Sequence, residues 1–275
     1  MKKVTVTSLR EMKSHGQRIT ALTAYDYPIA TLLDAAGIDI VLVGDSLGMA
    51  FRGESSTLGV TVEDIAYHTR AVRRGVKRAF LVADMPFLSS HGGLETTLNN
   101  VRRLMADGAE GVKIEGATPQ LLGAIARLTE AGIPVMGHIG LTPQSVHQLG
   151  GYRVQGKDDD AARRIVEQAR ALEEAGVFAI VLECVPDDLA EKVTKNVTVP
   201  TIGIGAGAGC DGQILVITDL LGLGDGTPPK FVKRYADLRG VISDAVAGFA
   251  ADVRHGAFPD AAHSYGPTPR RLKAL

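Results

Sequence analysis

The chain has 275 residues, 45% of them hydrophobic, which is enough apolar material for a sizeable buried core. Its 30 basic and 31 acidic residues leave a formal net charge of −1, so charge gives no reason to expect nucleic acid or a membrane surface as a partner. No secretory segment opens the chain and no apolar run reaches the roughly 20 residues of a membrane helix, so we expect a cytoplasmic protein.

A short helical pattern lies near the start of the chain. Ser8 and Glu11 have the spacing of a capping box, and Gly16 can end a helix. These signals predict an extra N-terminal helix before the first strand.

Eight short apolar runs follow, each of strand length and most of them bounded by Gly or Pro. They cover residues 19–26, 38–45, 79–86, 110–116, 133–140, 177–184, 200–207 and 214–222. Helical patterns lie between many of these runs, and the clearest are at 62–75, 118–132, 158–176 and 230–255.

This alternation predicts an α/β protein with the fold of a (β/α)8 TIM barrel, because eight βα units fit the roughly 250 residues of such a barrel. The alternative is an open doubly wound sheet, which commonly has fewer strands. We predict a single domain over residues 1–275. The N-terminal helix would close the bottom of the barrel, and residues 267–275 would form a loose tail.

Polar residues at the ends of the predicted strands would converge, because barrels build their sites at the C-terminal ends of the strands. They are Asp45 and Ser46 after the second strand, Asp84 after the third, Lys113 and Glu115 on the fourth, His138 on the fifth and Glu183 on the sixth. Taken singly, each has a structural explanation, as a turn or cap residue or, for His138, as an ordinary core histidine.

Together these residues indicate a metal site. Lys113 and Glu115 lie two residues apart, so both point to the same side, where unpaired charges are expensive. One amine cannot balance the several carboxylates, but a divalent cation can. Oxygen ligands without cysteine or paired histidines favour Mg²⁺ over Zn²⁺. We predict that Asp45 and Asp84 bind Mg²⁺, and that Glu115 binds it directly or holds a bound water.

Such a site suits an α-keto acid, whose carbonyl a Mg²⁺ ion can polarise so that an enolate is stabilised. A separate base must remove the proton next to the carbonyl, and Glu183 is the best-placed candidate, with His138 next. Lys113 would complement the negative charge of the substrate. Ser46 would hydrogen-bond the substrate carboxylate through its hydroxyl, its backbone N–H, or both.

Several other features have competing interpretations. Lys113 could instead form a Schiff base, but Glu115 beside it would keep the amine protonated. The Gly-rich turn at 203–212 fits close backbone packing near a substrate better than phosphate binding. The loops at 91–100 and 142–157 are candidate lids, and we favour reading His91 and His147 as ordinary loop residues. Both cysteines, at 184 and 210, lack metal-ligand spacing and are expected to be inert.

Motif segments over nearly the whole chain are similar to those of one enzyme family. They are "ITALTAYD", "VGDSLGM", "ADMPF", "VKIEG", "GHIGLTPQS" with "GGYRVQGK", "LECVP", "GIGAG" with "DGQILV", and "FPDAAHSYG". On these segments the sequence resembles the ketopantoate hydroxymethyltransferase family. One departure lies at Ala208-Gly209-Cys210, where a more polar stretch is expected, and it bears on contacts to folate.

The resemblance implies a barrel of the phosphoenolpyruvate/pyruvate-type superfamily. It implies transfer of a hydroxymethyl group from 5,10-methylenetetrahydrofolate to 3-methyl-2-oxobutanoate, which gives ketopantoate for pantothenate and coenzyme A biosynthesis. Where the motifs match, the resemblance implies that Asp45 and Asp84 are the Mg²⁺ ligands with Glu115 in the metal shell. It also implies that Glu183 is the proton acceptor. The keto acid would contact Asp45, Ser46, Asp84 and Lys113. The family also implies a homo-oligomer, a homodecamer.

Two rival functions remain. One is a C–C lyase or mutase of the same superfamily that acts on an α-keto acid or phosphoenolpyruvate through the same chemistry. The other is a barrel without catalysis that only binds a keto acid or serves as a scaffold. A scaffold has no need to hold charges in a desolvated crevice, which counts against the second.

Overall fold

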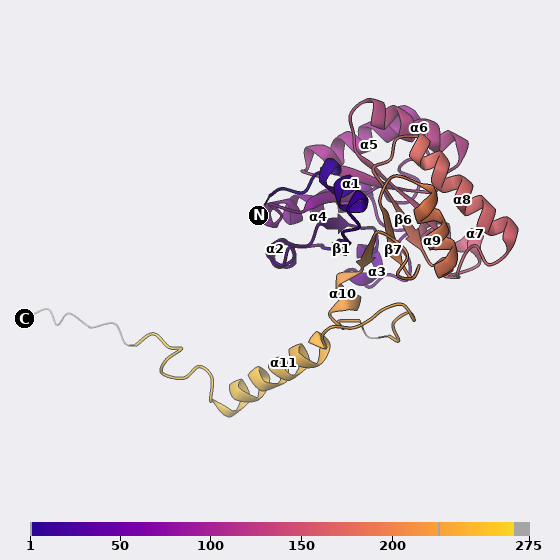
Figure 1. The fold of residues 1–275 in the computed structure, drawn as a ribbon. Coiled ribbons are helices and arrows are strands. Elements are labelled where there is room, and N and C mark those ends of the chain that lie inside the picture. The colour runs from indigo at the N-terminus through magenta and orange to yellow at the C-terminus, as the bar shows by residue number, and fades with distance from the viewer. Residues whose placement is uncertain (1, 225, 267–275) are drawn as a thin grey trace, which may run out of the picture.

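A closed barrel of eight parallel strands forms the body of the molecule, with β8 paired to β1 (Figure 1). The computed structural model describes residues 2–224 and 226–266. The strands are β1 (Ile19–Thr23), β2 (Ile40–Val43), β3 (Phe80–Asp84), β4 (Gly111–Glu115), β5 (Val135–Gly140), β6 (Ala179–Glu183), β7 (Thr201–Ile204) and β8 (Gly212–Leu215). The barrel prediction is therefore confirmed over the open sheet, while the expected tail at 267–275 lies outside the described residues.

Helices cover the outside of most of the barrel. The longer helices that do so are α2 (Tyr27–Ala35), α4 (Val62–Gly75), α5 (Leu94–Ala106), α6 (Pro119–Glu130), α8 (Asp159–Glu174) and α9 (Asp187–Asn196), while α1 (Val6–Ser14) and α11 (Leu238–His255) lie elsewhere. The single turns are α3 (Leu47–Ala50), η1 (Pro143–Ser145), α7 (Val146–Leu149) and α10 (Ile217–Leu220). The loop predicted at 91–100 was wrong for most of its length, because residues 94–100 begin helix α5.

The last two βα units differ from the predicted regular repeat. Residues 205–211 run from β7 to β8 without a helix. The eighth strand begins at Gly212, so the run predicted at 214–222 was placed too late, and α10 occupies 217–220. Apolar content alone did not distinguish this short strand from the helical turn after it.

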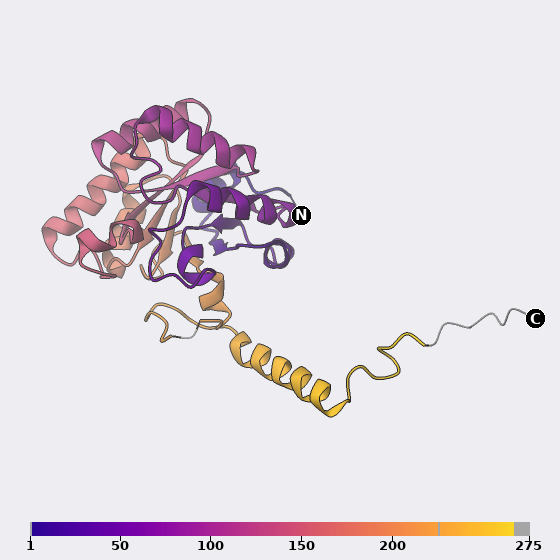
Figure 2. The ribbon, with the colours of Figure 1, turned by 180° about the vertical axis from the view of Figure 1, so that it is seen from behind.

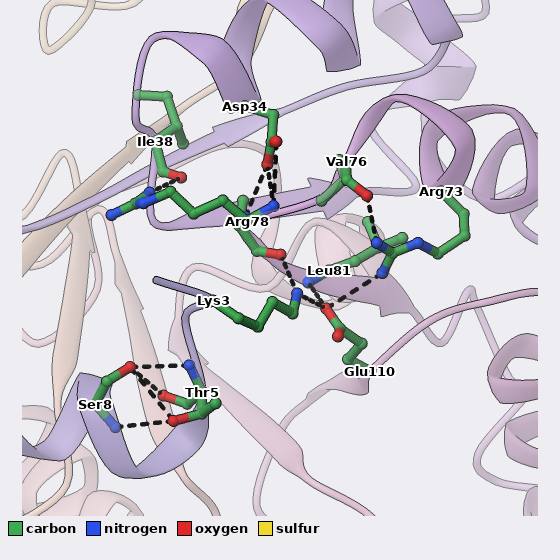
Figure 3. A network of polar contacts seen from close by, with 11 residues as sticks. Lys3, Thr5, Ser8, Asp34, Ile38, Arg73, Val76, Arg78, Leu81 and Glu110 are labelled. Atoms are coloured by element: carbon green, nitrogen blue, oxygen red, sulfur yellow. Dashed lines mark hydrogen bonds and ion pairs between the residues drawn. The ribbon is translucent and has the colours of Figure 1, made fainter. Parts of the chain in front are cut away.

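The N-terminal helix closes the bottom of the barrel, as predicted, but its cap lies three residues earlier. Thr5, not Ser8, is the N-cap, and the Thr5 and Ser8 side chains bond each other's backbone N–H groups reciprocally (Figure 3). A serine at the third helical position can serve the capping box in place of the usual glutamate. From this helix Leu9 is fully buried against the barrel interior.

Polar contacts beside helix α1 fix the loops that lead into the strands. Arg78 donates to the Ile38 carbonyl at 2.9 Å, and its backbone N–H donates to the Asp34 carboxylate at 2.8 Å (Figure 3). Lys3 pairs with Glu110, which also accepts from the backbone of Leu81 at 3.0 Å. The N-terminal ends of β3 and β4 are therefore held together on the face opposite the strand ends that carry the predicted site.

The barrel interior has an apolar lower layer below the predicted site residues. Inward side chains such as Ile40, Val82 and Met136 form this layer with Leu9. Strand side chains alternate in direction, so residues two further along these strands also point inward, at the opposite end of the barrel. The alternation therefore carries Asp84 on β3 and His138 on β5 to the C-terminal mouth.

The last helix, α11, projects away from the barrel instead of packing on it (Figures 1 and 2). It begins at Leu238, later than the predicted start at residue 230, and it has no buried residue. Asp237 caps it by accepting from the backbone of Gly240. Consequently no helix of the described residues covers the outer face of β8 and β1 at Thr20 and Gln213, which are paired in register and exposed.

Among the helices of the described residues, none combines the length and the apolar content that a bilayer crossing needs.

Candidate active site

A cavity of about 370 Å³ opens at the C-terminal ends of the strands. All seven side chains that the sequence singled out line it: Asp45, Ser46, Asp84, Lys113, Glu115, His138 and Glu183. The barrel register brings them together, since Asp84 lies opposite Lys113 and Glu115 opposite His138. The prediction that they converge is confirmed.

Lys113 lies at the centre of this cluster and is almost fully buried, with 4% of its surface exposed. Its Nζ lies 3.0 Å from Asp84 Oδ1 and 3.5 Å from Glu115 Oε1. His138 Nδ1 lies 3.3 Å from the same amine. Burial acts to lower the pKa of Lys113, but the surrounding carboxylates outweigh it and hold the pKa above its ordinary value. The amine stays protonated, which disfavours a Schiff-base role.

The carboxylates around Lys113 have divergent proton affinities. Burial, and then the charges of Asp84 and Glu115, raise the pKa of Asp45 well above its ordinary value. Burial also raises the pKa of Asp84. Burial would raise the pKa of Glu115 as well, but Lys113 and His138 outweigh it and lower that pKa to about 2. The cluster is therefore short of positive charge on the side of Asp45 and Asp84.

The surroundings of Asp45 and Asp84 fit a magnesium ion. Asp45 donates its backbone N–H to Asp84 Oδ2 at 3.1 Å, so the two residues are adjacent. Asp84 Oδ1 is buried without a well-aligned hydrogen bond, although it faces Lys113. In the described residues no group of three or more His, Cys, Asp or Glu side chains is arranged to hold a metal unaided. Mg²⁺ commonly takes one or two carboxylates and completes its shell with water or substrate, so this donor set suits it.

His138 bridges two carboxylates across the barrel. Its Nδ1 lies 3.3 Å from Glu115 Oε1, and its Nε2 lies 3.2 Å from Glu183 Oε2. Burial and Lys113 act to lower the pKa of His138, but the two glutamates outweigh them and raise it to about 9. Glu183 itself is only partly buried, at the end of β6. It is therefore the carboxylate of the cluster with open access to the cavity.

Ser46 follows β2 and precedes the single turn α3. Its hydroxyl lies 2.8 Å from the hydroxyl of Tyr25. Burial raises the pKa of Tyr25 to about 12, so the tyrosine is neutral and can donate. The Ser46 side chain is thus already oriented by a neighbour at the rim of the cavity.

The segment at 142–157, predicted as a lid, lies across the mouth. Gln144 donates from Nε2 to Asp45 Oδ2 at 2.8 Å and from its backbone to Glu115 Oε2 at 3.1 Å. Tyr152 reaches the sulfur of Met49 at 3.5 Å. The backbone N–H of Gln155 donates to the carbonyl of Cys184 at 2.8 Å. His91 and His147 are exposed and do not line the cavity, and His91 lies in a loop as expected, whereas His147 lies in the single turn α7.

The Gly-rich turn touches the cavity only at its start. Ile204 lines the wall, whereas residues 206–210 do not. The departure at Ala208-Gly209-Cys210 therefore lies outside the cavity. The thiol of Cys210 is buried, and that of Cys184 lines the cavity with its pKa raised to about 11 by burial and by Glu183. Both thiols are protonated at neutral pH, in agreement with their expected inertness.

The sequence did not single out Gln144, which donates to Asp45, nor Tyr152 and Thr57, which line the cavity. The first two lie in the segment predicted as a lid, so their location was indicated but not their contacts. Thr57 lies in an irregular loop after α3, where no periodicity points to the site. It is buried, yet its hydroxyl has no hydrogen-bond partner in the described part of the chain.

Solved structures of other proteins share the fold of this chain. Phosphonopyruvate hydrolase in complex with oxalate and Mg²⁺ is 18% identical, with a TM-score of 0.61 over 96% of this chain and 93% of that one. A 2,3-dimethylmalate lyase is 16% identical, with a TM-score of 0.61 over 95% of this chain and 92% of that one. At these identities the likeness concerns the fold alone.

The chain belongs to the ketopantoate hydroxymethyltransferase family, whose model matches residues 3–261. A 3-methyl-2-oxobutanoate hydroxymethyltransferase of Thermoanaerobacter sp. (strain X514) is 52% identical over 98% of this chain and 99% of its own length. That of Carboxydothermus hydrogenoformans is 50% identical over the full length of both chains. The family is one of transferase enzymes, and the resemblance found in the sequence motifs is confirmed.

Replacing Thr57 with Val tests whether its hydroxyl is unpartnered in the free protein. The change should leave the free energy of unfolding unchanged or raise it by up to about 1 kcal/mol, because it removes a buried polar group without a partner. Urea unfolding of the ligand-free protein measures this.

The matched control is Thr97→Val. Thr97 is equally buried, but its hydroxyl donates to the Gly93 carbonyl at 2.9 Å. Losing that bond should cost about 1 kcal/mol. An equal loss at Thr57 would show that its hydroxyl has a partner.

Proposed function

We propose that the protein transfers a hydroxymethyl group from 5,10-methylenetetrahydrofolate to 3-methyl-2-oxobutanoate and forms ketopantoate. The observation that carries this is the meeting of Asp45, Asp84, Lys113, Glu115 and Glu183 in one buried cavity of a chain from this family. Purified protein supplied with Mg²⁺ and both substrates should form ketopantoate. Absence of product would refute the proposal.

Glu183 is the proposed base. Its carboxylate takes the C3 proton of the keto acid, and the electron pair left behind forms the new bond to the methylene carbon of the donor. Both carbon–nitrogen bonds of that methylene group break. Water supplies the hydroxyl group, and the two nitrogens of the departing tetrahydrofolate take up two protons, one from the water and the one that Glu183 removed. His138, 3.2 Å from Glu183, holds the carboxylate toward the cavity. Partial exposure of Glu183 supports this role, since the base must reach the substrate.

Asp45 and Asp84 are the proposed ligands of Mg²⁺, with Glu115 in its shell. The ion would polarise the keto group and so make the C3 proton more acidic. Lys113 would face the negative charge of the keto acid, and Ser46 would hydrogen-bond its carboxylate. The raised pKa of Asp45 supports the assignment, because a second positive charge near this carboxylate would favour its ionised form.

The rival lyase or mutase would use much of the same cavity, since the fold matches enzymes of both kinds. Relatives at about 50% identity over full length favour the hydroxymethyltransferase instead. The buried, charged cluster disfavours a scaffold. A cytoplasmic location stays a prediction.

The protein is further proposed to be a homo-oligomer, a decamer. Helix α11 supports this with an apolar face of Ile242, Val246, Phe249 and Val253, which are 48–61% exposed. The outer face of β8 and β1 is also uncovered at Thr20 and Gln213. A second copy of the chain can cover both surfaces, whereas one copy leaves them in water.

Glu183→Gln should abolish exchange of the C3 proton of 3-methyl-2-oxobutanoate with solvent, because the amide cannot accept the proton. Proton NMR in D₂O with Mg²⁺ follows this exchange, and calorimetry should find keto-acid binding within about threefold of wild type. Exchange at the wild-type rate would show that the base is not Glu183.

Asp84→Asn should weaken Mg²⁺ binding by at least about tenfold, because an anionic oxygen ligand is lost at unchanged size. Isothermal titration with Mg²⁺ alone measures this. Asp159→Asn, on an exposed residue of α8, is the control. Wild-type affinity in the Asp84 variant would identify it as a turn residue.

Phe249→Asp should lower the molecular mass in light scattering after gel filtration, because a charge on the apolar face of α11 opposes burial against another copy. Ala247→Asp, which lies away from that face, should leave the mass unchanged. A monomeric wild-type protein would contradict the oligomer.

A further inference from the structure

The cavity extends past the charged cluster into a second part, here called the apolar half. It is lined by Cys184, Ile204, Val216, Asp219, Pro229 and Phe231. A volume of about 370 Å³ lies in the range of roughly 300–1,000 Å³ typical of pockets for drug-sized ligands. A small branched keto acid at the charged cluster leaves this half vacant for a second molecule.

Asp219 is the one acidic side chain in the apolar half. The backbone N–H of Ile217 donates to Thr23 Oγ1 at 3.0 Å, which anchors the start of α10 to the end of β1. Asp219 follows within that turn and lines the cavity. Its carboxylate is half-buried and has no side-chain hydrogen bond or ion pair within the described residues. Its burial raises its pKa, while Arg234 opposes the rise. A half-buried carboxylate that lines a cavity and has no side-chain partner is free to accept hydrogen bonds from a ligand.

Phe231, with its flat aromatic ring, lines the apolar half. Gly205 has a φ of +64°, and a Cβ there would lie 2.8 Å from Phe231 Cδ1 and 3.3 Å from Cys184 Sγ. Only glycine permits the ring to lie against the end of β7 at this distance. Cys184 directly follows Glu183, so the ring borders the proposed base.

We propose that the apolar half binds the pterin ring of the folate donor, an inference that rests on the proposed function. A reduced pterin is a fused ring with apolar faces, and one edge carries a ring N–H beside an exocyclic amine. Phe231 and the aliphatic side chains contact the faces. Asp219 accepts from the two neighbouring N–H groups, a bidentate geometry in which charge-assisted hydrogen bonds are strong. The transferable carbon then lies between the pterin and Glu183.

The segment that carries Phe231 also suits the rest of the donor. Lys230, Lys233 and Arg234 flank the phenylalanine and are exposed at the rim. Their charge is opposite to that of the glutamate tail of folate. The pterin end thus enters the cavity while the anionic end stays at the surface.

Asp219→Asn is the test, because the amide keeps the size of the side chain but cannot accept two hydrogen bonds in this way. Binding of tetrahydrofolate, the donor without its transferable carbon, should weaken by at least about tenfold in calorimetry. The KM for methylenetetrahydrofolate should rise by a similar factor. Solvent exchange of the C3 proton, measured with the keto acid and Mg²⁺ but no folate, should stay at the wild-type rate.

Two variants complete the design. Phe231→Leu, which keeps an apolar side chain but removes the ring, should also weaken tetrahydrofolate binding without slowing exchange. Asp159→Asn, the same change on the outer surface, should alter neither property. Unchanged tetrahydrofolate affinity in Asp219→Asn, or an equal loss of folate-free exchange, would overturn the assignment. Failure of the proposed function would be seen separately, as a wild-type protein that forms no ketopantoate.

Discussion

The protonated Lys113 is the interaction on which the site depends. Its amine lies 3.0 Å from Asp84 and 3.5 Å from Glu115, in a crevice where an unpaired charge would cost several kcal/mol. Without it, the acidic side chains at the strand ends would repel one another across the barrel mouth. With it, Glu115 stays ionised. The raised pKa of Asp45 indicates that one amine does not balance the negative charge of all the carboxylates. The lysine organises the cluster, and the remaining imbalance fits a divalent cation.

The fold supplies the rigidity that such a cluster requires. Charges packed this closely are tolerable only if each stays at its distance from the others, and the strands on which they lie are bonded along their length. Below them Leu9 and the inward apolar layer exclude water from the barrel. The polar contacts around Arg78 hold the opposite end. The site is thus positioned by elements that never touch a ligand.

The sequence predicted this part of the molecule because the charged residues break a pattern. A lysine and a glutamate inside an apolar strand, at 113 and 115, are not explained by packing, because a barrel core has no structural need for buried charges. The contacts made by loops, in contrast, could not be predicted from the sequence. Gln144 reaches Asp45 over 99 residues of chain, and no local periodicity encodes that approach. The start of β8 at Gly212, earlier than the predicted run, was missed because a short strand directly after a glycine-rich turn gives only a weak apolar signal.

The two halves of the cavity are held in place by different elements, and this difference links folate binding to oligomer formation. The charged half rests on barrel strands and is complete within one chain. The apolar half is closed by Phe231, on the segment 226–237 that leads into α11. That segment is held by few contacts of its own, such as the backbone bond from Tyr235 to Leu220 at 2.8 Å. If α11 packs on another copy, burial of its apolar face would also fix the segment before it. Oligomer formation would then fix Phe231 in the apolar half while leaving the charged half unchanged. Folate binding would therefore depend on assembly, whereas exchange of the C3 proton would not.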